Sequence, residues 1–384
     1  DFATAVPLKL ARVVGQQPMD IAEKLVKEIS SSEVIEKVWV ASPGFINIAI
    51  KDSWLSNQVQ EILDAKGKYG DSDLGLEKRV QIEFVSANPT GPRHVGHGRG
   101  AVLGSTLSNI LSTAGYSVTR EYYVNDSGSQ IDAFVSSLYA RYKQVLGQDV
   151  DMPPGSYMGE YMIDLANQVV EDVGKKLLAI SETEALGELK DIGLGKVMEG
   201  IKTDLSDLKV EFDEWFEESE LYASGQYKET MAKLEANGYV ASKDGAIWFV
   251  STALGEDKDN VLVRSTGTPT YFASDTAYHY NKLGVRNFDK VIDIWGADHK
   301  GHVSRIHAAM SALGLDPDKI NILISQLVTL KRDGEVVRLS KRSGDTISLR
   351  EVIDEVGADA CRYFFLARGY DSQMEFDLEL AKQR

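Results

Sequence analysis

Cysteine is nearly absent from this chain, whose 384 residues include only Cys361. A disulfide framework is therefore excluded, and a reducing compartment is indicated. Long apolar runs are lacking too: no stretch approaches the roughly 18 residues that a membrane span requires, and we find no signal peptide. We expect a cytoplasmic protein with no membrane segment.

Positive charge is also scarce. Lys and Arg number 42 against 58 Asp and Glu, for a formal net charge of −16. This balance argues against a general nucleic-acid binder, which would be basic. It does not exclude local basic patches, because charge is screened within about 10 Å. The remaining composition, 43% hydrophobic and 26% charged, is typical of a globular chain with two or three domains.

A stretch rich in glycine and histidine, residues 86–104, follows a strand-like run at 79–85 and precedes apolar residues at helical spacing. The pattern predicts a strand, a tight turn and a helix start, where backbone N–H groups and a partial positive charge favour an anion. His94 and His97 lie one turn apart there, and the glycines let a ligand approach the backbone. This combination suggests a nucleotide triphosphate.

Two alternatives stay open for this stretch. Glycines at a strand-to-helix turn often serve only tight packing, and His94 and His97 are spaced to bind a metal ion. A zinc site needs three or four ligands, however, and the chain has one cysteine, so we predict no metal site.

Two segments resemble the signatures of class I aminoacyl-tRNA synthetases. Residues 92–97, Pro-Arg-His-Val-Gly-His, resemble the HIGH signature, and residues 338–342, Arg-Leu-Ser-Lys-Arg, resemble the KMSKS loop about 240 residues further on. Among these enzymes, the arginyl-tRNA synthetases are most similar to the sequence segments at 82–92, 120–126, 271–275 and 295–299. Arg93 is a departure, because an apolar residue is common at that position of the first signature.

The resemblance implies ATP-dependent ligation of L-arginine to tRNA(Arg) through an arginyl-adenylate, with release of AMP and pyrophosphate. It implies that the catalytic residues are His94, His97 and Lys341. It implies ATP binding by Gly96, Gly98, Gly296, Asp298, His299, Arg338, Leu339, Ser340 and Arg342. It implies arginine binding by Glu83, Ser86, Asn88, His94, Tyr271 and Asp275. Mg²⁺ is expected mainly on the ATP phosphates, mostly through waters, with no protein ligand that we can name.

The guanidinium is expected between Glu83 and Asp275, because it needs carboxylate acceptors in a planar arrangement. Two structural readings compete with this assignment. Glu83 would pair with a strand neighbour, and Asp275 would be a surface helix residue.

The expected fold is α/β: a Rossmann-like nucleotide-binding catalytic domain with a parallel sheet and a helical or mixed insertion, preceded by a small α+β domain. We assign residues 1–75 to the N-terminal domain, which the resemblance places at the tRNA elbow and whose start would be missing. The catalytic domain is split over 76–135 and 261–335, around an insertion at 136–260. Residues 336–384 would be the signature loop and a helical linker. We interpret the chain as a monomeric fragment that lacks an anticodon-binding domain.

Local patterns predict individual elements. The predicted strands are 117–124, 291–295 and 320–330, and the predicted helices are 19–29 with Pro18 at its first position, 270–283 and a helix ending at 312. Hairpins are predicted at 42–44 and 333–334, a loop at 125–128, and a helix cap at Ser348 with Glu351. Residues 212–220 suggest a solvated helix face, and 338–344 an exposed, mobile, basic loop.

Two other functions compete with the synthetase. A nucleotidyltransferase of the same fold would make an adenylate without tRNA, but the N-terminal unit and the long insertion speak against it. A degenerate synthetase domain acting as a binding module would be expected to lose His94, His97 or Lys341, and all three are present.

Overall fold

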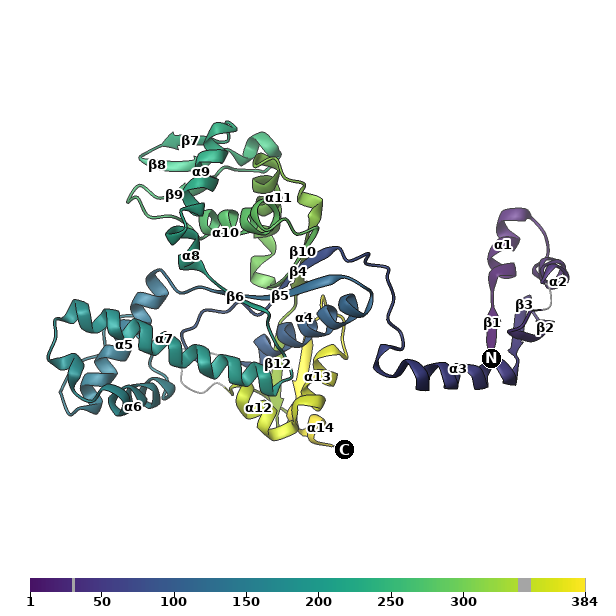
Figure 1. The fold of residues 1–384 in the computed structure, drawn as a ribbon, viewed down its shortest axis with the longest axis horizontal. Helices are drawn as coiled ribbons and strands as arrows, with labels where there is room; N and C mark the ends of the chain where they lie inside the picture. Colours follow the sequence, from purple (N-terminus) through teal and green to yellow (C-terminus); the bar gives the residue numbers. More distant parts are fainter. Residues whose placement is uncertain (30–31, 338–346, 384) are drawn as a thin grey trace. The chain divides into compact units, whose positions relative to one another are not determined.

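The computed structural model describes residues 1–29, 32–337 and 347–383, and it divides the chain into two compact units, Asp1–Asp71 and Ser72–Arg384. The first unit is a three-stranded antiparallel sheet, ordered β1-β3-β2, with helices (Figure 1). Its elements are β1 (Phe2–Thr4), α1 (Val6–Val14), α2 (Pro18–Glu28), β2 (Ile35–Ala41), β3 (Phe45–Ile50), α3 (Asp52–Ala65) and η1 (Lys66–Lys68).

Two predictions for this unit are confirmed. Pro18 occupies the first turn of α2, where its missing N–H costs nothing. The hairpin at 42–44 joins β2 to β3, with Ala41 opposite Phe45. Gly44 has φ +136°, and a Cβ there would lie 2.6 Å from Cβ of Pro18. Glycine is therefore required where the hairpin approaches α2.

A five-stranded parallel sheet forms the centre of the second unit, which confirms the Rossmann-like prediction. Its strands are β4 (Arg79–Glu83), β5 (Ser117–Val124), β6 (Glu214–Glu217), β10 (Lys290–Gly296) and β11 (Ile320–Ser325), in the order β11-β10-β4-β5-β6. Helix α4 (Val95–Thr113) connects β4 to β5. Because the strands are parallel, their carboxyl ends share one edge, where ligands bind in such sheets.

The two faces of the sheet differ in character. On β4, Val80, Ile82 and Phe84 point into a core shared with α4. Gln81 and Glu83 alternate with them and point to the opposite face, yet both are at most 6% exposed. Buried parallel strands are normally apolar on both faces, so polar side chains on one buried face mark it as functional.

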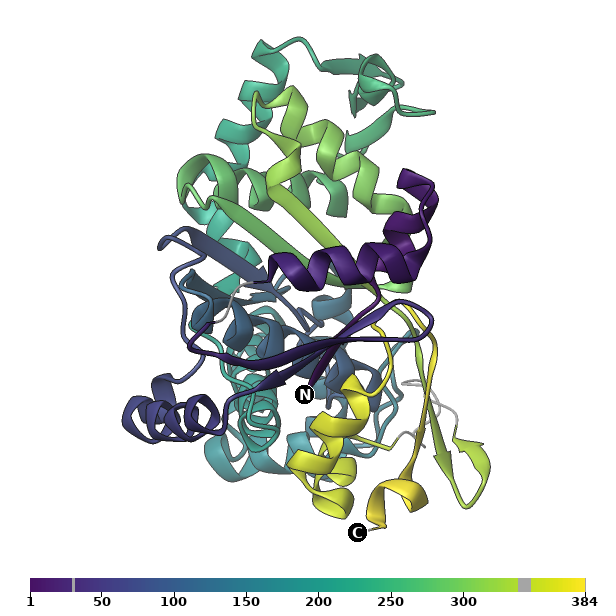
Figure 2. The ribbon, with the colours of Figure 1, turned by 90° about the vertical axis from the view of Figure 1, so that its right-hand side faces the viewer.

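Three groups of elements surround this sheet (Figures 1 and 2). The first is helical: α5 (Ser129–Val145), α6 (Tyr161–Val173), η2 (Lys176–Leu178) and α7 (Glu182–Asp207). The second comprises α8 (Glu218–Ala223), α9 (Gln226–Ala236), β7 (Val240–Lys243), β8 (Ala246–Phe249), η3 (Ser251–Leu254), β9 (Asn260–Val263), α10 (Tyr271–Tyr280), the π turn η4 (Asn281–Val285), η5 (Ala297–His302), α11 (Val303–Ala312) and η6 (Pro317–Lys319). The third comprises β12 (Val328–Arg332), β13 (Glu335–Val337), α12 (Leu349–Val356), α13 (Ala358–Leu366), β14 (Met374–Asp377) and α14 (Leu378–Lys382).

Most of the predicted elements of this unit are confirmed. Strand β5 has the predicted bounds, and Asp333-Gly334 forms the β12–β13 turn with φ of +51° and +81°. Ser348 and Glu351 form the predicted capping box of α12. Across the described ranges, the search for a helix long and apolar enough to cross a membrane finds none.

Two predictions were wrong. Residues 212–220 are not a solvated helix face: β6 joins the parallel sheet beside β5, and Trp215 stacks on Tyr122 with ring centroids 4.8 Å apart. Residues 320–330 form two strands in different sheets. The break falls at Gln326, whose carbonyl accepts from Arg99 (3.0 Å) and whose N–H donates to Tyr370 (2.9 Å).

Two glycines on α4 provide a matched test of its packing. A Cβ at Gly104 would lie 2.2 Å from Cγ of Phe84, a buried ring stacked on Phe212, whereas a Cβ at Gly100 meets no atom within 4 Å. We expect Gly104→Ala to lower the free energy of unfolding by about 1–3 kcal/mol through overpacking. Gly100→Ala should raise it by roughly 0.5–1 kcal/mol through helix propensity. Urea unfolding midpoints measure both, and equal shifts would contradict the packing model.

Candidate active site

Helix α4 begins with the two signature histidines. His94 is the N-cap, its Nδ1 accepting from the backbone N–H of Gly96 (3.1 Å), and Nδ1 of His97 accepts from the N–H of His94 (3.3 Å). The rings lie 3.8 Å apart between centroids. A Nδ1 that accepts requires the proton of a neutral ring to be on Nε2. Both rings are therefore oriented as Nε2–H donors beside a helix N-terminus, which suits a phosphate.

The loop between β4 and α4 is strained and tightly braced. Val85 and Ser86 have φ of +71° and +36°, which is unusual for residues with a side chain and frequent at functional sites. The Ser86 hydroxyl accepts from the N–H of Tyr123 (3.1 Å), and the Asn88 amide donates to Gln130 (2.6 Å). The two predicted substrate contacts are thus held in place by neighbours.

Arg93, which the sequence leaves without explanation, is fully buried under this loop. Its Nη2 donates to the carbonyls of Asn88 (2.7 Å) and Gly91 (2.6 Å). Its own carbonyl accepts from the N–H of Leu349 (2.7 Å). Arg93 therefore braces the loop against the first residues of α12.

The predicted glycines have different surroundings. A Cβ at Gly98 would lie 2.7 Å from Leu349 and 3.0 Å from Phe365, so glycine is required there for helix packing. A Cβ at Gly96 would lie 3.0 Å from the His94 ring. Gly296 ends β10 at the exposed sheet edge, where a Cβ would lie 2.6 Å from Oδ1 of Asp298. ATP contacts by these glycines stay a prediction.

A row of carboxylates crosses three strands on the face opposite α4. Asp293 on β10 is the register partner of Glu83 on β4, and Glu83 is the partner of Glu121 on β5. All three are at most 6% exposed. Like charges at neighbouring positions repel strongly in a low-dielectric interior, so the row requires cations to face it.

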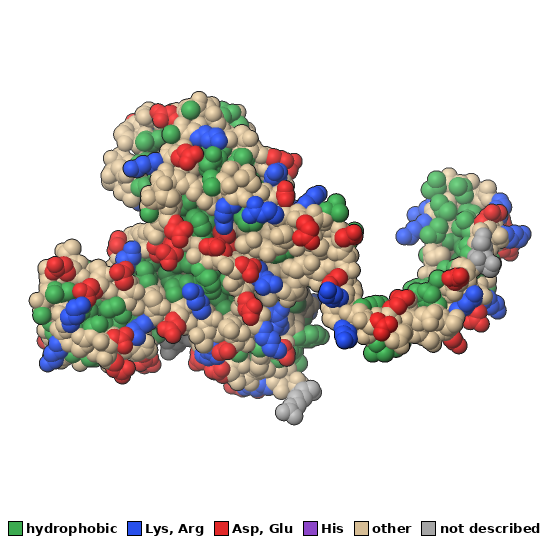
Figure 3. All heavy atoms as spheres, in the orientation of Figure 1, with side chains coloured by type: hydrophobic (Ala, Val, Ile, Leu, Met, Phe, Trp, Pro, Cys, Tyr) green, Lys and Arg blue, Asp and Glu red, His purple; other side chains and the backbone are tan. Residues whose placement is uncertain are grey.

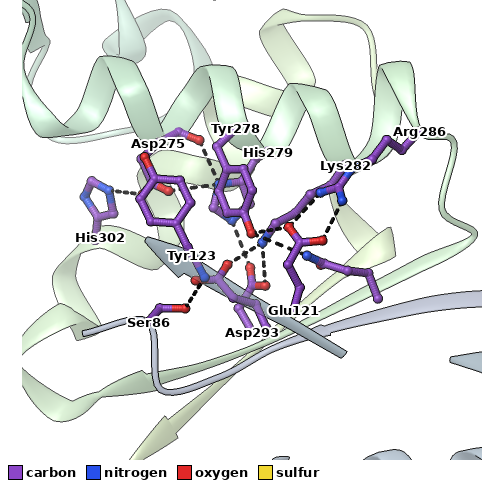
Figure 4. A network of polar contacts seen from close by, with 12 residues as sticks. Ser86, Glu121, Tyr123, Asp275, Tyr278, His279, Lys282, Arg286, Asp293 and His302 are labelled. Carbon is purple, nitrogen blue, oxygen red and sulfur yellow. Dashed lines mark hydrogen bonds and ion pairs between the residues drawn. The ribbon is translucent and has the colours of Figure 1, made fainter. Parts of the chain in front are cut away.

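Two cations meet this row, Lys282 within η4 and Arg286 directly after it (Figure 4). Nζ of Lys282 donates to Glu83 (2.6 Å) and Asp293 (2.8 Å) and lies 4.2 Å from the ring centroid of Tyr278. Arg286 forms a two-point ion pair with Glu121. The reading of Glu83 as the partner of a strand neighbour is thus wrong: the ion pair is with a residue 199 positions away.

Asp275 is buried and faces two histidines, so its reading as a surface residue is wrong. Oδ2 contacts Nε2 of His302 (2.7 Å), and Oδ1 lies 3.1 Å from Nδ1 of His279. Nε2 of His279 contacts Asp293 (2.9 Å), and Nδ1 also contacts the Asp275 carbonyl (2.8 Å). Both ring nitrogens of His279 face only acceptors, so the ring is an imidazolium.

The pKa directions agree with this geometry. Burial opposes the charge on His279, but Asp275 and Asp293 together outweigh it and raise the pKa to about 10. Burial likewise opposes ionisation of Asp275, and His279 and His302 reverse this to lower its pKa well below the usual range. Burial raises the pKa of Glu83, an effect that Lys282 partly offsets. Of these two carboxylates, Glu83 is therefore the one whose ionised form is less favoured.

The mouth of the cluster is aromatic. Tyr271, one turn before Asp275, is exposed, and its ring lies 5.6 Å from His302 and 6.3 Å from His299 between centroids. Trp295 lies 6.0 Å from His299 and 5.8 Å from His302. Asp298 points outward, with its side chain 83% exposed. These predicted residues thus gather at the end of β10.

Residues 136–260, to which the sequence analysis assigned no chemistry, also contribute to the site. Glu218 at the start of α8 is 8% exposed, and burial raises its pKa despite hydrogen bonds from Ser274 and Tyr123. Asp126, in the predicted loop after β5, accepts from the N–H of Ser219 (3.0 Å). Acidic side chains gather over this region in Figure 3, and they favour a cationic ligand.

Sequence reasoning also missed His279, Lys282, Asp293, Glu121 and His302. A signal exists in hindsight: charged residues recur at helical spacing through 275, 279, 282 and 286, and single carboxylates interrupt the apolar strands. Charged side chains that recur on the buried face of a helix indicate a network of ion pairs in the interior rather than a face exposed to solvent.

The downstream signature, residues 338–342 with Lys341, lies outside the described residues. Its flanks are described: Val337 pairs with Leu330, and Ser348 forms a bridge with His94. The chain therefore re-enters the fold beside the first signature. Over the described ranges, a search for three or more clustered His, Cys, Asp or Glu side chains able to hold a metal ion finds none.

The parallel sheet and the histidine-capped start of α4 are those of a class I aminoacyl-tRNA synthetase catalytic domain, as the match to the family model shows. Residues 58–365 match the family model of class I (R) tRNA synthetases, catalytic domain, and residues 1–50 match the arginyl tRNA synthetase N-terminal domain. The chain belongs to the arginyl-tRNA synthetase family.

Relatives agree with this assignment. The chain is 58% identical over its whole length to an arginine–tRNA ligase of Dehalococcoides mccartyi and spans 69% of that protein. It is 49% identical to that of Desulfitobacterium hafniense, spanning 68%. A solved Campylobacter jejuni chain described as an arginyl-tRNA synthetase is 35% identical with a TM-score of 0.79, over 87% of this chain and 72% of that one. The Thermus thermophilus enzyme, 19% identical with a TM-score of 0.70 over 100% of this chain and 72% of that one, shares the fold.

The His279 imidazolium predicts a pH dependence of stability. Its pKa rises from 6.5 in the unfolded chain to about 10 in the fold, so its contribution is complete below pH 6.5 and is lost as pH rises through 10. We expect His279→Gln to cost about 3–5 kcal/mol near pH 6, as for a broken buried ion pair, and progressively less toward pH 10. Urea unfolding of both proteins at several pH values measures this. A cost independent of pH would contradict a charged His279.

Proposed function

We propose that this chain ligates L-arginine to tRNA(Arg) through an arginyl-adenylate. A carboxylate oxygen of arginine attacks the α-phosphorus of ATP, and the bond to pyrophosphate breaks. The terminal adenosine hydroxyl of the tRNA then attacks the arginyl carbonyl, releasing AMP. The single observation that carries the arginine assignment is the buried cluster of Glu83, Asp275 and Asp293 with two cations. The carboxylates of this cluster outnumber its buried cations, which favours a cationic ligand.

The geometry described above supports the substrate roles that we propose. Glu83 and Asp275 bind the guanidinium beside Tyr271, and Ser86 and Asn88 orient the amino and carboxylate groups. These residues line one end of β4 and the start of α10. A guanidinium spreads its charge over a planar fork that suits two carboxylates, which supports arginine over other amino acids.

The nucleotide roles rest on the helix start. His94 and His97 donate to ATP phosphates through Nε2, and Lys341, with Arg338, Leu339, Ser340 and Arg342, neutralises the departing pyrophosphate. Gly96, Gly98, Gly296, Asp298 and His299 border the nucleotide. Mg²⁺ enters on the ATP phosphates, because the described residues offer no ligand cluster of their own. Such transfers depend mainly on positioning and electrostatics. We further propose a cytoplasmic monomer.

Amino-acid-dependent ATP–pyrophosphate exchange tests the function. We expect exchange with arginine and no other amino acid, and only when tRNA is added, because the arginyl family needs its tRNA for activation. Phosphate contacts make tRNA binding salt-dependent, so exchange should increase as salt is lowered. Full exchange without tRNA would favour the tRNA-independent adenylyltransferase.

Replacing Asp275 tests the arginine site. Asp275→Asn should weaken arginine binding by roughly 2–5 kcal/mol, because a buried guanidinium loses a charged acceptor, while ATP binding changes less than twofold. Calorimetric titration with each ligand measures the difference. Asp359→Asn is the matched control, since that carboxylate is 84% exposed and pairs only with Lys209 in the described fold. Unchanged arginine affinity in Asp275→Asn would remove Asp275 from the site.

A further inference from the structure

Each of the two carboxylates proposed to bind arginine is contacted by a buried cation. Lys282 contacts Glu83 at 2.6 Å, and His279 contacts Asp275 at 3.1 Å. Both cations also contact Asp293, at 2.8 and 2.9 Å, on different oxygens. Asp293 thus joins the two arms into one network, visible in Figure 4.

This network is buried, and its central side chains have hydrogen-bond or ion-pair partners. The side chains of His279, Lys282 and Asp293 are 0% exposed. The ammonium of Lys282 has two carboxylates and the Tyr278 ring as neighbours, and the ring of His279 has an acceptor at each nitrogen. A buried charge without partners is costly, so these cations cannot exchange with water or turn toward a ligand. Their effect must pass through Glu83 and Asp275.

Carboxylates outnumber the fully buried cations in this network. Three carboxylates, on Glu83, Asp275 and Asp293, face two cations, on Lys282 and His279. Without Lys282, Asp293 would repel the charge on Glu83 across one strand spacing, and burial would then favour a protonated, neutral Glu83. A neutral Glu83 accepts hydrogen bonds poorly and cannot balance a guanidinium.

We propose that Lys282 and His279 are positioning residues that keep Glu83 and Asp275 ionised and oriented, and thereby decide selection of the cationic guanidinium over its neutral isosteres. This inference rests on the proposed arginine site. Neither residue touches the substrate. Their role is to keep the carboxylates at the mouth of the network negatively charged, so that a planar cation binds there in preference to a neutral group.

Citrulline, a neutral isostere of arginine, separates this role from mere support of the pocket. Lys282→Met should weaken arginine binding roughly ten- to hundredfold, the range for one charge-assisted hydrogen bond. Citrulline and ATP binding should change less than twofold. Calorimetric titration of the full chain with the three ligands gives the arginine-to-citrulline ratio. Equal losses for arginine and citrulline would overturn the proposal, because a loosened pocket weakens both.

Arg286→Met is the matched control. It removes a cation from the same helical face, but its partner Glu121 lies one strand beyond Glu83 and is also bound by Tyr278. We expect lower stability with an unchanged arginine-to-citrulline ratio. A ratio that falls as far as in Lys282→Met would overturn a specific role for Lys282.

A double variant covers the case in which Lys282→Met does not fold. Glu83→Gln with Lys282→Met removes the cation together with one of its two carboxylates, while Asp293 keeps His279 as its partner, and thermal melting checks the fold. Its arginine affinity should equal that of Glu83→Gln alone, since Lys282 acts through Glu83. A further loss would overturn the inference. Failure of the wild-type chain to bind arginine, or an unaltered affinity in Glu83→Gln, would instead overturn the proposed function.

Discussion

The arrangement of the second unit depends on one electrostatic constraint: acidic side chains at matching register on three adjacent parallel strands. In a low-dielectric interior such a row is unfavourable unless cations face it. Lys282, in the π turn that follows α10, and Arg286, directly after that turn, meet this requirement. The position of that helix over the sheet, and with it the position of Asp275, follows from this need. The proposed arginine site and the stability of the sheet therefore share the ion pairs of Lys282.

The two signature regions are joined by main-chain contacts as well as by chemistry. The bridge between His94 and Ser348, and the bond from Leu349 to Arg93, tie the end of the downstream segment to the start of α4. Side-chain identity matters little to such contacts. A signature residue such as Arg93 can therefore depart from the usual apolar type as long as it packs, and here it adds two bonds to the loop carbonyls.

Local signals predicted much of this molecule, and long-range pairing explains what they missed. Caps, turns and alternating strands are determined by a few neighbouring residues. For this reason β5, the Asp333-Gly334 turn and the Ser348 cap could be predicted. Membership of β6 in the sheet depends on pairing with β5, about 90 residues earlier. The break at Gln326 depends on Arg99, 227 residues away. The partners of Glu83 and Asp275 likewise come from register between distant strands, which no local pattern contains.

The strand order has a consequence for synthesis of the chain. Strand β4 lies between β5 and β10, and Arg79 meets Asp289 across 210 positions. A ribosome adds about 5–20 residues each second, so the β10-facing edge of β4 waits roughly 10–40 s for its partner. An uncovered strand edge is a template for wrong pairing. During that interval Glu83 has neither Lys282 nor Asp293 beside it. Charged side chains on an uncovered strand oppose pairing with another chain, so a carboxylate that needs partners in the folded protein has a separate use before those partners are made.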